Sequence, residues 1–113
     1  MINSLIVNIL SEYINREDVK YLKYSGTADT YAVFNYAGER GTNYADDEPE
    51  DIESSMQVHI FTRSPAVYKA IKGAVREALF KAGFSYPAIT ELYEKETNYY
   101  HVVYECEFVE GRE

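Results

Sequence analysis

The clearest pattern in the chain is a change of hydrophobic period near its middle. Met56, Val58 and Ile60 alternate with other residues, which predicts a β-strand over 56–62. Beyond that segment the apolar residues recur every three or four positions, which predicts an amphipathic helix over 65–82. The middle of the chain is therefore a strand followed directly by a helix.

Three residues mark the ends of this helix. Ser64 can accept a hydrogen bond from a free amide of the first turn. Pro65 suits the first helical position, because its missing N–H would have no partner there. Gly83 stands where many helices end on a left-handed residue.

The remaining segments carry weaker patterns. Apolar residues from Leu5 to Tyr13 lie on one stripe and predict an N-terminal helix that ends near Asn15. A hairpin turn is predicted near Thr97-Asn98. Strand-like spacing recurs in four more segments: 19–24, 31–36, 88–96 and 99–110.

This order of elements predicts a single α+β domain over residues 1–113. Two helices would pack on one face of a mainly antiparallel sheet of about four to five strands. In the strand 99–110, Tyr100 and every second residue up to Phe108 would form the core face. The other face of the sheet is then either wet or covered by a partner.

Residues 37–53 interrupt this regularity. Glycines and a proline break the strand pattern, and the carboxylates stand close enough to repel one another. We therefore expect an extended, mobile acidic loop. Its spacing does not fit a calcium loop, because Gln57 stands where a bidentate glutamate is needed, although loose binding of divalent cations stays open. The acidic residues that we expect to contact partners are Asp46, Asp47, Glu48, Glu50, Asp51 and Glu53.

A second set of candidate contact residues lies on the polar side of the helix predicted over 65–82. Two interpretations of this set stay open. It is either a solvated face or a basic strip that meets the acidic loop of a neighbouring copy. Its members are Lys69, Lys72 and Arg76, with Lys81 at the end of the helix.

Composition narrows the function classes. A net charge of −8 argues against a protein that wraps nucleic acid, because phosphate contacts need clustered lysine and arginine. No apolar run reaches the length of a membrane span, and no signal peptide is visible, so we expect a soluble cytoplasmic protein. The 12 tyrosines favour a protein–protein interface and an open sheet face equally.

Few side chains invite a catalytic interpretation. His59 and His101 are expected on the strand face away from the core, where they could be metal ligands or acid–base groups. Without a partner motif, ordinary surface histidines are the favoured interpretation. Cys106 is expected in the core beside Glu105 and Glu107, which does not suit a nucleophile. We expect no enzyme, no cofactor and no metal site.

The order of the segments resembles that of the tail-completion proteins of long-tailed bacteriophages and prophages, also described as tail terminator or tail-to-head joining proteins. The resemblance covers nearly all of the chain and rests on order, length and pattern. The stretches that carry it are INSLIVNILSEYI, YAVFNYAGE, MQVHIFTRSPAVYKAIKGAVREALFKAGF and YYHVVYECEF.

The resemblance implies a structural protein of the virion, present in the bacterial cytoplasm during assembly. Such proteins form a hexameric ring on the head-proximal end of the tail tube. Their partners are other copies of themselves, the tail tube protein and the head connector or stopper protein, with DNA only as the passing genome and no membrane. An acidic chain suits this role, because fixed negative charge keeps phosphates from sticking.

Other interpretations stay open beside this one. The chain could be another phage neck component, such as a head-completion protein or a connector adaptor. It could also be an acidic binding module that mimics DNA, which predicts acidity over one continuous face. A metal-assisted hydrolase at the acidic loop is the enzyme alternative, but it lacks a defined ligand set.

Overall fold

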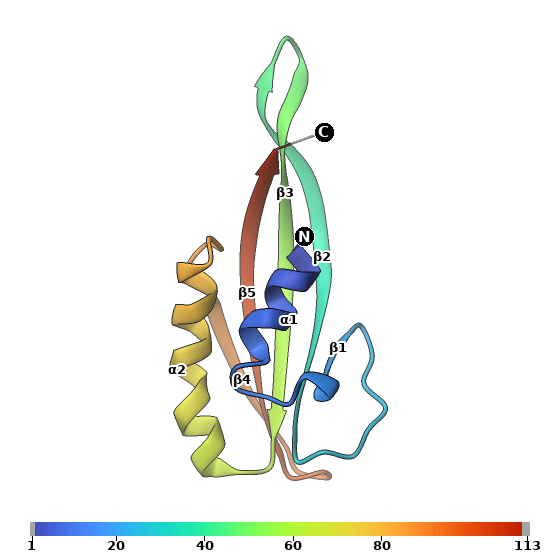
Figure 1. Cartoon of the computed structure of the whole chain (residues 1–113), viewed down its shortest axis with the longest axis vertical. Coiled ribbons are helices and arrows are strands. Elements are labelled where there is room, and N and C mark those ends of the chain that lie inside the picture. Colours follow the sequence, from blue (N-terminus) through green and yellow to red (C-terminus); the bar gives the residue numbers. More distant parts are fainter. Residues whose placement is uncertain (1, 112–113) are drawn as a thin grey trace.

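The computed structural model describes residues 2–111. In this part of the chain, helices α1 (Ile2–Leu10) and α2 (Pro65–Lys81) lie on one face of a five-stranded sheet (Figure 1). The predicted α+β class is confirmed. The strands are β1 (Val19–Tyr21), β2 (Thr30–Ala45), β3 (Glu48–Thr62), β4 (Ala88–Glu94) and β5 (Tyr99–Gly111).

The sheet has the strand order β1-β2-β3-β5-β4. β1 pairs with β2 in parallel, and all other neighbours are antiparallel. A short 3₁₀ helix, η1 (Arg16–Asp18), leads into β1. β1 ends three residues before the predicted limit of 24, because Leu22 turns the chain with a φ of 69°. Neither helix among residues 2–111 is long and apolar enough to cross a membrane.

The predicted ends of α2 are confirmed. The Ser64 hydroxyl accepts a hydrogen bond from the backbone N–H of Val67, and Pro65 occupies the first turn. Gly83 follows the helix with a φ of +112°, in the left-handed region that favours glycine. These residues determine where α2 begins and ends, and the apolar spacing of Ile71, Val75 and Leu79 determines which side faces the sheet.

The core fills the space between the two helices and the sheet. Tyr104 lies fully inside it, and its hydroxyl donates a 2.8 Å hydrogen bond to the backbone carbonyl of Lys72, so the buried phenol has a partner. The alternation along β5 places Val102, Tyr104 and Cys106 in the core as expected, whereas Tyr100 and Phe108 at the ends of the expected core face are only partly buried. The other large, fully buried side chains are Phe34, Phe84, Ile2, Ile6, Leu10, Met56, Ile60, Leu79, Val58, Val75 and Val102.

The expectation of a loop over residues 37–53 is wrong. β2 and β3 continue as one hairpin through this segment and turn at Asp46 and Asp47, whose φ angles of 53° and 66° fit a two-residue hairpin turn. We call residues 37–53 the arm. The carboxylates nearest the turn are exposed to water, which weakens their mutual repulsion, and Glu53 and Asp51 bind Arg40 and Asn43 of the facing strand.

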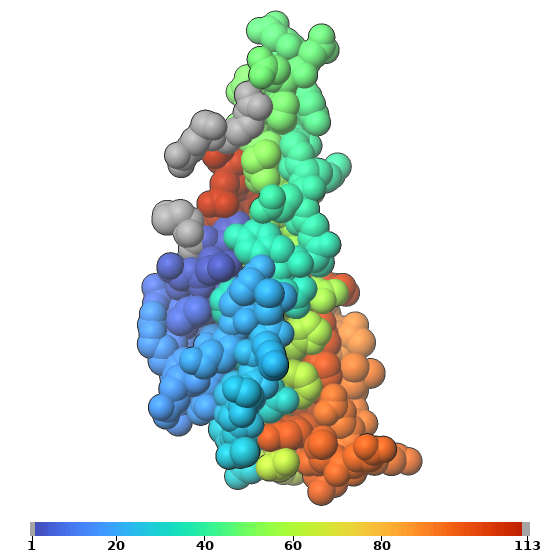
Figure 2. Space-filling view, turned by 90° about the vertical axis from the view of Figure 1, so that its right-hand side faces the viewer, coloured from blue at the N-terminus to red at the C-terminus, as the bar shows by residue number. Residues whose placement is uncertain are grey.

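The arm projects from the body of the molecule. β5 pairs with β3 as far as Asp51, opposite Gly111, and beyond that pair the described chain has only β2 and β3. Figure 2 shows this end as a narrow extension above the rest of the molecule. It contributes to the elongated shape, which measures 52 × 24 × 24 Å.

Two glycine substitutions give opposite expected effects on stability. Gly83→Ala places a Cβ at positive φ and 3.2 Å from Cε1 of Phe108, so we expect unfolding to become easier by about 1–3 kcal/mol. Gly73→Ala in the exposed part of α2 meets no heavy atom of the described residues within 4 Å, the helix's own backbone apart. We expect it to stabilise the protein by about 0.5–1 kcal/mol.

Urea denaturation of the two variants beside the parent protein measures these differences. Equal effects of Gly83→Ala and Gly73→Ala would contradict the left-handed end of α2.

Candidate interaction surfaces

The sheet face opposite the helices carries a row of stacked rings. Tyr24 stacks on Tyr31 with ring centroids 4.1 Å apart, Tyr31 on Phe61 at 4.6 Å, and Phe61 on His101 at 4.0 Å. The row starts in the connection after β1 and crosses β2, β3 and β5. This end of the face is therefore closed largely by the protein's own aromatic side chains.

His59 and His101 belong to the same face and contact each other directly. His59 Nδ1 and His101 Nε2 lie 2.9 Å apart and share a hydrogen bond. His101 is only 8% exposed, and its Nδ1 lies 3.5 Å from a carboxylate oxygen of Glu94. Both histidines lie on the sheet face away from the core, as predicted. The favoured interpretation of ordinary surface histidines is wrong, because the two rings bind each other and His101 is buried.

Sequence spacing alone could not reveal this contact. It depends on the register between β3 and β5, which sets Phe61 opposite His101 and His59 opposite Val103. The two histidines are therefore diagonal neighbours across the strand pair, within reach of each other's rings.

Burial lowers the pKa of both histidines below the usual value. The charge of His59 lowers the pKa of His101 further, whereas Glu94 raises it and Glu105 raises that of His59. Both rings are thus neutral near pH 7. In a neutral pair each ring carries one N–H. Because Glu94 faces Nδ1 of His101, we assign the proton of His101 to Nδ1, so that its Nε2 accepts a hydrogen bond from Nδ1–H of His59.

Cys106 is buried on the helix-covered face of the sheet, as the sequence predicted. Burial raises the pKa of its thiol to about 12, and the charge of Glu107 adds to this effect. A thiol in this setting packs as a small apolar group and does not attack substrates.

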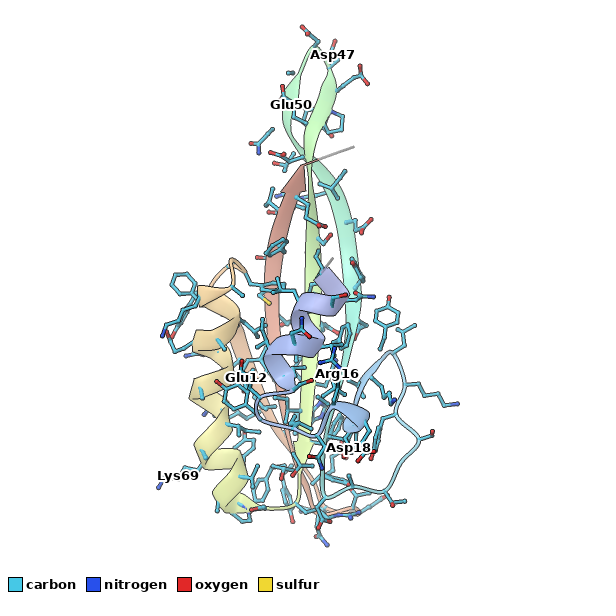
Figure 3. The ribbon with its side chains drawn as sticks, viewed as in Figure 1. Glu12, Arg16, Asp18, Asp47, Glu50 and Lys69 are labelled. Atoms are coloured by element: carbon cyan, nitrogen blue, oxygen red, sulfur yellow. The ribbon has the colours of Figure 1, made fainter. Side chains whose placement is uncertain are left out.

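The acidic candidates all lie on the arm. Glu53 forms a 2.6 Å ion pair with Arg40, and Asp51 accepts a hydrogen bond from the side-chain amide of Asn43. Asp47 and Glu50 project outward near the tip (Figure 3). Asp46 shares the turn with Asp47, and Glu48 begins β3.

The basic candidates lie on α2 and differ in how they are held. Lys72 forms a 2.8 Å ion pair with Glu91 of β4, and its hydrogen bond, followed by that of Tyr68, lowers the pKa of Glu91. The Arg76 guanidinium packs over the ring of Tyr86, 5.0 Å from its centroid. Lys69 projects away from the body (Figure 3).

The tip of the arm and the first turns of α2 lie toward opposite ends of the molecule (Figure 1). Asp47 and Glu50 are at one end of the long axis, and Lys69 is at the other (Figure 3). One copy therefore does not bring Asp47 and Glu50 together with Lys69. A contact between them has to join two copies.

The described residues contain no group of three or more histidine, cysteine, aspartate or glutamate side chains suited to holding a metal ion. No family model matches the chain, and no curated protein is significantly similar to it. The function must therefore be argued from the residues and their geometry.

The histidine pair predicts a pH dependence of stability. Because the folded pKa values lie below the unfolded value of about 6.5, the unfolded chain binds more protons in this range. The contribution of the histidine pair to the free energy of unfolding is complete above about pH 6.5. It is lost as the pH falls through the pKa values that the two histidines have in the folded protein. We expect the free energy of unfolding to decrease between about pH 7.5 and 5.

Urea titrations across this interval measure the effect. The double variant His59→Gln/His101→Gln is the control and should show a shallower slope. If the free energy of unfolding changes equally with pH in the parent and the variant, groups other than the two histidines account for the pH dependence.

Proposed function

We propose that this protein is a structural component of a bacteriophage or prophage tail. In this role it assembles as a hexameric ring on the head-proximal end of the tail tube and joins the tail to the head connector. The observation that carries the proposal is the arm, together with the resemblance in segment order. An acidic tip that lies far from Lys69 of its own α2 suits a chain that meets copies of itself.

The charge distribution supports this arrangement. Seven acidic side chains and one arginine lie on the arm, so it carries −6 of the net charge of −8. The rest of the chain is close to balance and includes the basic residues of α2. Opposite charges on separate surfaces favour association between copies and fix its orientation.

An arm-to-α2 contact between copies is compatible with a closed ring. In a ring the arm of each copy meets α2 of the next, so two different patches join in a heterologous contact. Such contacts leave one free arm and one free α2 at the ends of every open chain of copies. A ring forms when the rotation between neighbours closes, and it uses all of these surfaces.

The strand pairing of the arm lowers the cost of such a contact. A mobile loop would lose conformational freedom on binding, and that loss would offset part of the gain. The arm is instead held by the β2–β3 ladder before any partner binds. Only its side chains then have to become ordered.

An acidic binding module is the second candidate, favoured by the same concentration of carboxylates. It predicts tight binding to a basic DNA-handling protein and no ring. The carboxylates occupy one narrow arm instead of a broad face, which fits a DNA mimic less well than an assembly contact.

Charge reversal tests the contact between copies. We expect Lys69→Glu/Lys72→Glu to weaken self-association at low salt by about tenfold, because exposed ion pairs contribute about 0.2–1 kcal/mol each. Reversal on the arm, Asp47→Lys/Glu50→Lys, should weaken it similarly. Combining the two sets should restore association in part.

Sedimentation analysis at low and high salt, with electron microscopy of the particles, provides the measurement. Lys23→Glu/Lys95→Glu is the matched control, because it changes the same net charge outside both surfaces. If α2 reversal leaves association unchanged at low salt, α2 is only a solvated face. Parent protein that stays monomeric at high concentration beside its tail partners would contradict the ring itself.

A further inference from the structure

We propose that His59 and His101 form a binding site for a divalent transition-metal ion, with Zn²⁺ as the best fit. The site lies on the sheet face opposite the helices and joins β3 to β5. It is independent of the proposed function, because it uses neither the arm nor the basic residues of α2.

The distance between the two nitrogens suits a shared metal ion. His59 Nδ1 and His101 Nε2 are 2.9 Å apart. Two Zn–N bonds of about 2.0–2.1 Å at a tetrahedral angle place the nitrogens about 3.3 Å apart. The pair therefore has to open by about 0.4 Å. Because the ring centroids lie 5.2 Å apart and the two nitrogens face each other nearly in line, each ring also has to turn by roughly 35° for its lone pair to point at the metal.

Glu94 is placed as a carboxylate that positions a metal-binding histidine. Its Oε2 lies 3.5 Å from His101 Nδ1, a buried nitrogen without a well-aligned hydrogen bond among the described residues. Metal-binding histidines commonly donate their second N–H to such a carboxylate, which fixes the tautomer and leaves the other nitrogen free to bind. Phe61, stacked 4.0 Å from the ring of His101, restrains that ring as well.

The proton inventory balances without an external base. Before the metal binds, the Nδ1–H of His59 donates to Nε2 of His101. The metal takes the place of this proton, which moves to Nε2 of His59 as the ring changes tautomer. Both imidazoles stay neutral and each gives one lone pair to the metal, while His101 keeps Nδ1–H directed at Glu94.

Two imidazole ligands determine which ions fit. Imidazole suits Zn²⁺, Cu²⁺ and Ni²⁺, whereas Mg²⁺ and Ca²⁺ prefer oxygen ligands. With two protein ligands, water completes the coordination, so binding is weaker than at a closed four-ligand site. Glu105, whose charge acts on His59 from the same face, adds a favourable field for a cation.

Titration of the full, tag-free chain with ZnCl₂ tests the site. We expect one Zn²⁺ per chain by calorimetry and a rise in melting temperature that EDTA reverses, because an ion that binds only the folded state stabilises it. MgCl₂ and CaCl₂ at the same concentrations should give no comparable shift. Asp46→Asn/Asp47→Asn removes arm carboxylates and should leave the Zn²⁺ effect intact.

Substitution of the ligands gives the decisive comparison. His59→Gln and His101→Gln should abolish the Zn²⁺ shift, and Glu94→Gln should weaken binding by roughly tenfold through loss of the positioning carboxylate. A shift of equal size in His59→Gln would overturn the proposal and assign the effect to carboxylates.

Imidazole ¹⁵N spectra of the parent protein answer the question even if a variant does not fold. Zn²⁺ should shift the resonances of His59 Nδ1 and His101 Nε2 and leave Nδ1 of His101 protonated. Unchanged imidazole spectra at saturating Zn²⁺ would overturn the proposal.

Discussion

The structure depends on the pairing of β3 on both of its sides. This strand pairs with β2 along its whole length and with β5 from Asp51 to Thr62. Its residues from Ser54 to Thr62 alternate between the helix-covered core and the ring-covered face, whereas its first residues belong to the arm. One strand therefore links the stability of the body to the placement of the acidic surface, and a shift of register by one residue would disrupt both.

The same pairing creates the histidine pair. His59 and His101 meet because β3 and β5 are antiparallel neighbours in a fixed register, and the stacked rings beside them leave little room for another arrangement. The two ends of the sheet thus differ in character. The body end is closed by aromatic rings, and the arm end presents carboxylates to water. This separation is why the arm suits a partner outside its own chain.

Local sequence signals were sufficient for α2 and for the fold class. Ser64, Pro65 and Gly83 act within a few residues of themselves, so their effect is visible without the rest of the chain. The arm was not predictable in this way. Its glycines, proline and carboxylates are each unfavourable in a strand, and the ladder that overcomes them joins residues on two separate strands. The histidine contact required the same kind of information, because alternation gives the face of a residue but not its neighbour across the sheet.

The most direct test of the structural role is to read the genes on either side of the one that encodes this chain. If the protein completes a tail, its neighbours encode a head connector protein and an abundant tail tube protein, since the proposed ring must join these two. Neighbours without any virion genes would contradict the tail assignment, and the acidic binding module would then become the leading interpretation.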